Sequence, residues 1–131
     1  MRILLPALLL AFVGCAKKQS TPLEEIPKLT KLADVMDNQS TVADPLFKKM
    51  NQESFSDEEY QAMADAAARL QVTAPKIKDF SKGPEMDALA TRLGEKAKAL
   101  GDAAQAKNAA ASATALKEMK ATCKECHSKF K

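Results

Sequence analysis

Apolar side chains recur every three or four residues along the last part of this 131-residue chain. Between about residues 108 and 129, this stripe consists of Ala109, Ala113, Leu116, Met119, Cys123, Cys126 with His127, and Phe130. The period predicts one α-helix whose apolar face is buried, because residues three and four apart share a helix face.

Three further stripes of the same period predict three more helices. The first is expected from near Leu23, with Asp44-Pro45 kinking or restarting it. The second opens with a capping box at Ser56–Glu59, and Pro75 is expected to bend or split it. The third covers roughly residues 85–104, after a loop at 81–84. With no strand pattern, the predicted fold class is all-α: an antiparallel four-helix bundle over residues 23–131.

The N-terminal segment predicts export. Residues 1–14 combine Arg2 with an apolar run of about a dozen residues, too short to span a bilayer and typical of a signal peptide. The sequence "FVGC" resembles a bacterial lipobox, which implies lipidation of Cys15, followed by a tether through residue 22. The alternative is ordinary signal cleavage after Ala16. Lipidation would anchor the protein to a membrane on the periplasmic side, and the residues after Cys15 favour the outer membrane over the inner one.

The charge excludes one class of partner. Loss of residues 1–14 removes Arg2 and no acid, so the net charge falls from +3 to about +2. Such a mild, dispersed charge does not predict nucleic-acid binding. There is no Trp and one Tyr, so a buried cofactor would help to complete a small core.

Three chemistries compete for Cys123, Cys126 and His127. Structural zinc needs four ligands, and this domain offers three. A redox C-x-x-C usually opens a helix beside strands, whereas this one ends an all-helical chain. C-x-x-C-H is also the attachment motif of haem c. Its two thiols form thioethers with the haem vinyl groups, and its imidazole becomes the proximal iron ligand. Export favours this third hypothesis, with one covalent haem.

Four helices closing in "CKECHSKFK" resemble the class II cytochromes c, which include cytochrome c′ and its six-coordinate relatives. The resemblance implies that Met119, Phe130 and Lys131 neighbour the haem. In six-coordinate members a Met on the first helix is the distal ligand, and Met36 in "KLADVMDNQ" occupies the matching place. Leu32 stands where that family often has Arg. Met36 as a flexible core filler is the alternative, and Met50 and Met63 are weaker candidates.

The predicted function is therefore that of a monohaem electron carrier with transient redox partners, not an enzyme, since no second His supports acid–base chemistry. Two alternatives remain. Five-coordinate iron would bind nitric oxide or carbon monoxide, and a haem subunit could mainly stabilise a larger respiratory complex. The resemblance also allows a homodimer, because members of the family often pair through their first two helices.

Overall fold

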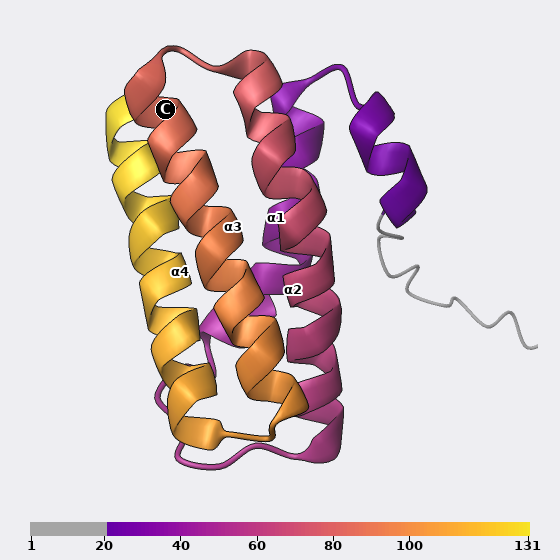
Figure 1. Cartoon of the computed structure of the whole chain (residues 1–131), viewed down its shortest axis with the longest axis vertical. Coiled ribbons are helices and arrows are strands. Elements are labelled where there is room, and N and C mark those ends of the chain that lie inside the picture. Colours follow the sequence, from indigo (N-terminus) through magenta and orange to yellow (C-terminus); the bar gives the residue numbers. More distant parts are fainter. Residues whose placement is uncertain (1–20) are drawn as a thin grey trace, which may run out of the picture.

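A computed structural model describes residues 21–131, and every structural statement below concerns this range. Its elements are η1 (Leu23–Lys28), α1 (Leu32–Phe47), α2 (Asp57–Ile77), η2 (Lys78–Phe80), α3 (Pro84–Gln105) and α4 (Ala109–Phe130). The four α-helices run alternately up and down as a bundle, and no strand occurs in the described range (Figure 1). The predicted fold class is confirmed. The predicted signal peptide and Cys15 lie outside the described residues, and no described helix is long and apolar enough to cross a bilayer.

The start of the first helix was predicted wrongly. A short 3₁₀ turn comes first, Leu29 is extended with φ −62° and ψ 133°, and α1 begins only at Leu32. Pro27 lies inside the 3₁₀ turn, and the chain leaves helical geometry two residues later, at Leu29. Ile26 is fully buried, so the turn still contributes to the core.

The two internal prolines lie inside their helices, and a separate 3₁₀ turn, η2, follows α2 three residues after Pro75. Pro45 lies within α1 and Pro75 within α2, and each helix continues for two more residues. The Asp44-Pro45 pair therefore does not restart a helix. Proline so close to a helix end removes one hydrogen bond from a turn that is about to finish, which limits its effect.

Local signals at other helix ends are confirmed. The Ser56 hydroxyl accepts from the Glu59 N–H at 3.2 Å, and the Glu59 carboxylate accepts from the Ser56 N–H at 2.8 Å. Asn108 caps α4 by accepting from the Ala111 N–H at 3.0 Å. These caps satisfy N–H groups that have no partner inside the helix.

Small residues bring α2 and α3 close together. A Cβ atom added at Gly101 would lie 3.2 Å from the Cβ of Ala67, whereas one at Gly94 would lie 3.7 Å from that of Ala74. Helix α4 packs against α3, and α1 packs against α2 but touches α4 much less. The interface between α1 and α4 is therefore the loosest in the bundle.

Candidate functional site

A cavity of about 710 Å³ lies where α1 and α4 diverge. Its α4 wall contains Cys123, Cys126 and His127 together with Phe130 and Lys131. Its α1 wall contains Leu32, Met36, Gln39 and Phe47, and side chains of α2 and α3 form its back: Leu70, Ile77, Met86, Leu89, Ala90 and Leu93. The volume is within the usual range of about 300–1,000 Å³ for small-molecule and cofactor pockets.

The three motif residues of α4 all line this cavity but differ in how exposed they are to solvent. Cys123 and Cys126 are partly buried free thiols, whereas His127 is exposed while still lining the cavity. Burial, with smaller contributions from the neighbouring Cys126 and Asp44, raises the pKa of Cys123 to about 11. Burial also raises the pKa of Cys126, with Glu125 adding to the effect. The haem-free thiols are therefore protonated at neutral pH.

The α1 wall brings Met36 into the same cavity. This side chain is half-buried and packs against the main core. Met50 and Met63 are not among the lining residues, and Met63 is fully buried. Met119 is also fully buried in the core rather than on the cavity wall, while Phe130 and Lys131 line the cavity as expected for haem neighbours.

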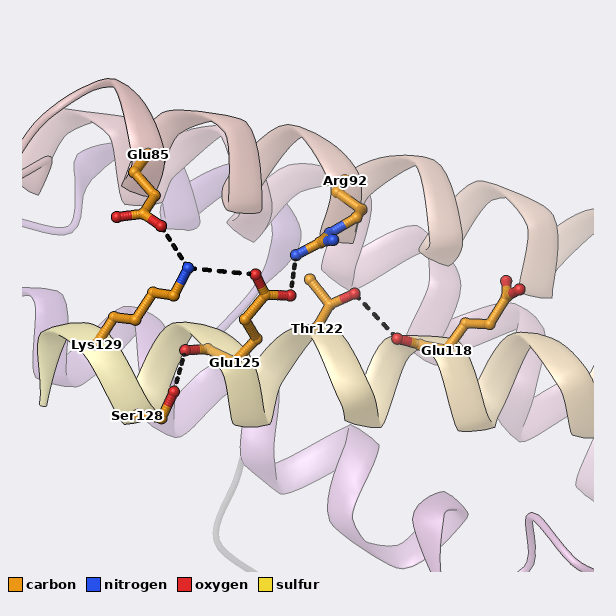
Figure 2. Close-up of polar contacts among 7 residues, drawn as sticks. All are labelled: Glu85, Arg92, Glu118, Thr122, Glu125, Ser128 and Lys129. Carbon is orange, nitrogen blue, oxygen red and sulfur yellow. Dashed lines mark hydrogen bonds and ion pairs between the residues drawn. The ribbon is translucent and has the colours of Figure 1, made fainter.

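Three ion pairs join α3 to the outer side of α4, and we call them the α3–α4 seam. They are Lys96–Glu118 at 2.8 Å, Arg92–Glu125, and Glu85–Lys129. Figure 2 shows Glu125 held by Arg92 on one side and by Lys129 on the other. The hydrogen bond from Arg92 lowers the pKa of Glu125, and the bond to Glu85 raises that of Lys129.

The seam lies on the side of α4 away from the C-x-x-C-H motif. Glu125 stands inside the C-x-x-C-H motif, yet it lies about 150° around the helix from the direction shared by the two thiols and His127, at about 100° per residue. Binding of Glu125 to α3 is therefore compatible with a motif that faces the cavity. Sequence reasoning missed this seam, although the recurrence of acids at Glu118 and Glu125 was visible.

One buried polar pair also escaped prediction. Gln39 lines the cavity, and its amide donates to the Thr73 hydroxyl at 3.1 Å. Thr73 is fully buried and donates in turn to the Arg69 carbonyl at 3.1 Å. Nearby, Arg69 donates to Asn38 at 3.0 Å. These bonds hold α1 on α2 beside the cavity.

Comparison with known families agrees with this architecture. Residues 70–131 match the family model described as Cytochrome C', which covers the end of α2 and all of α3 and α4. Together with its helical bundle, the match shows that the chain belongs to this family, the class II cytochromes c. Met36 lies outside the matched stretch. Comparisons with curated proteins and with solved structures find no match to the chain.

The family binds haem c covalently, and the residues present fit such a group. Two thiols and an imidazole lie on one face of α4, and the remaining walls are largely apolar. Within the described residues, no three His, Cys, Asp or Glu side chains are grouped to hold a bare metal ion, so zinc gains no support. Cys123 and Cys126 would hold the haem through thioethers, and His127 would ligate its iron.

Proposed function

We propose that the protein is a periplasmic one-electron carrier whose haem iron is ligated by His127 and Met36. The observation that carries this proposal is that Met36 of α1 and His127 of α4 line one cavity. A flat macrocycle attached to α4 and filling that cavity would have an imidazole on one face and α1 on the other. Belonging to the Cytochrome C' family supports the haem, while the role of Met36 rests on its position.

Met36 would add two properties to the bound haem. Thioether ligation favours the reduced state and raises the redox potential. Filling the sixth position also blocks exogenous ligands, which favours electron transfer over chemistry on a bound molecule. The apolar side chains of the inner walls would lower the local dielectric around a bound haem.

A five-coordinate, gas-binding protein is the second candidate. Members of the family are typically haem electron carriers or gas-binding proteins, and the name Cytochrome C' fits either role. The observation in favour of gas binding is the apolar surroundings of Met36, since a thioether that packs as a filler would leave iron open in an apolar pocket.

The visible spectrum of the holoprotein separates the two candidates. A low-spin spectrum that carbon monoxide leaves unchanged is expected for wild type. Met36→Ala should give high-spin iron that binds carbon monoxide. Met50→Ala is the matched control, because Met50 packs against the core but is not part of the cavity wall. A low-spin Met36→Ala protein would exclude Met36 as ligand, and a high-spin wild type would favour gas binding.

We also propose that lipidated Cys15 anchors the protein to a membrane, preferably the outer membrane. The tether of residues 15–22 would let the bundle reach transient partners. Mass spectrometry of the mature N-terminus tests this directly. Acyl groups on Cys15 are expected, and an unmodified N-terminus after Ala16 would refute the anchor.

A further inference from the structure

One side of α4 carries lysines and no acids. At about 100° per residue, Lys117, Lys120 and Lys124 fall within a sector of about 60°. Lys131 directly follows the end of the helix, and we call these four residues the lysine stripe. The sector lies directly beside the one that presents Cys123 and His127. Lys120, Lys124 and Lys131 themselves line the cavity, and Lys117 extends the stripe along the exposed surface.

The lysines of the stripe differ from the acids of α4 in whether they form ion pairs. Both acids of this helix are bound to α3 in the seam, Glu118 by Lys96 and Glu125 by Arg92. Figure 2 shows the contact of Glu125. None of the four lysines forms a side-chain hydrogen bond or ion pair within residues 21–131. The seam therefore neutralises the acids on one side of the helix and leaves four positive charges on the other.

Acidic residues on the α1 wall of the cavity reduce the positive charge of the lysine stripe without cancelling it. Asp37 and Asp44 of α1 also line the cavity. Asp44 is near enough to Cys123 to raise the pKa of that thiol, and Asp37 has an interaction of its own. Among the residues that line the cavity, three lysines face two carboxylates, and Lys117 adds a fourth positive charge beside them. The α4 side of the cavity mouth is therefore the positive side.

We propose that the lysine stripe docks a redox protein that presents carboxylates, so that electrons pass through the adjacent cavity mouth. This inference rests on the proposed electron-carrier function and names the chemistry of the partner. Complementary charge steers encounter and orients two proteins more than it raises affinity. A stripe on the helix that carries the haem would bring the partner to the cofactor's edge.

The test uses oxidised holoprotein and two electron donors of opposite charge. Flavodoxin hydroquinone, an acidic protein, gives up one electron and becomes the semiquinone. Hexaammineruthenium(II), a small cation, gives up one electron and becomes ruthenium(III). Stopped-flow absorbance follows haem reduction at several salt concentrations. The variant is Lys120→Gln with Lys124→Gln. The matched control is Lys48→Gln with Lys78→Gln, which removes the same charge from lysines that also lack ion pairs within residues 21–131.

At low ionic strength the stripe variant should react with flavodoxin roughly tenfold more slowly, and salt should remove the difference. The control should slow by about twofold or less, because its charges lie on other elements. With hexaammineruthenium(II), the stripe variant should react no more slowly than wild type. The proposal would be overturned if both variants were reduced by flavodoxin equally slowly. It would also be overturned if the stripe variant were reduced more slowly than wild type by both donors.

Two further outcomes point elsewhere. A changed midpoint potential with unchanged flavodoxin kinetics would assign the lysines to the carboxylates of the haem itself and overturn docking. Stripe-dependent binding to anionic phospholipid vesicles, with unchanged flavodoxin kinetics, would assign them to the membrane and also overturn it. The haem spectrum and reversible reduction are recorded first, so failure of the electron-carrier function is distinguished from failure of docking.

Discussion

The two cysteines of the haem-free chain should ionise differently, and Cys123 gives the sharper test. Burial raises its pKa from 9.0 to about 11. At pH 8 about one Cys123 in a thousand is then a thiolate, against nearly one in ten for an unperturbed thiol. The more basic thiolate is roughly tenfold more nucleophilic, so the net loss of reactivity at pH 8 is about tenfold.

The shape of the pH profile is therefore more decisive than the rate at one pH. For folded Cys123, the rate of alkylation by iodoacetamide should still rise about tenfold between pH 9 and pH 10. In urea-unfolded chain it should already be levelling off. Trypsin separates the two sites, because Lys124 lies between Cys123 and Cys126, and mass spectrometry then measures each. A folded profile for Cys123 that levels off near pH 9 would refute the burial of this thiol.

The same shift makes stability depend on pH. The folded chain holds the Cys123 proton more tightly than the unfolded chain, so this contribution to stability is complete below pH 9.0 and is lost as pH rises to about 11. Two pKa units correspond to a total loss on the order of 3 kcal/mol, of which about half has occurred by pH 10. Urea titrations of wild type and Cys123→Ala at pH 8 and pH 10 isolate the contribution of Cys123. The free energy of unfolding should fall less between these two pH values in Cys123→Ala than in wild type. Parallel declines in both proteins would contradict the linkage.

Three further predictions concern the bundle, each measured as the free energy of unfolding in urea. Gly94→Ala should stabilise the bundle by up to about 1 kcal/mol. Gly101→Ala should gain less or destabilise it, because the added Cβ would lie 3.2 Å from the Cβ of Ala67 in α2. Equal gains in stability would contradict the close packing of α2 and α3. Thr73→Val should cost about 1–3 kcal/mol by leaving Gln39 unpaired, and adding Gln39→Leu should recover part of it; additive losses would argue against their hydrogen bond. Ser56→Ala should cost about 1 kcal/mol through loss of the capping box, and an unchanged stability would show that this cap is dispensable.

Local features of the fold were accessible from the sequence. The stripe of α4 and the capping box at Ser56–Glu59 depend on neighbours in the chain, so spacing alone predicted them. The break before Leu32 was missed because the apolar period runs through Pro27 unchanged. The backbone leaves helical geometry at Leu29, while Ile26 still reaches the core from a 3₁₀ turn.

The candidate site was predictable in its chemistry and not in its surroundings. Cys123, Cys126 and His127 are fixed by their spacing, and the family resemblance directed attention to Met36. The α3–α4 seam and the Gln39–Thr73 bond depend on which helix faces pair, a property that arises only on packing. The exposure of His127 was likewise not foreseen, because a helix stripe indicates a direction but not where the neighbouring helix stands.

The loose contact between α1 and α4 has a consequence for how the bundle can be loaded. α4 is bound to α3 by the seam, and α3 is packed closely on α2, so these three helices form a continuous half-shell. α1 is joined to that shell mainly by α2 and by the connection at residues 48–56. Displacing α1 opens the cavity along its whole length while the thiols keep their places. A rigid, flat cofactor could then enter broadside from the side of the bundle rather than threading in from its end.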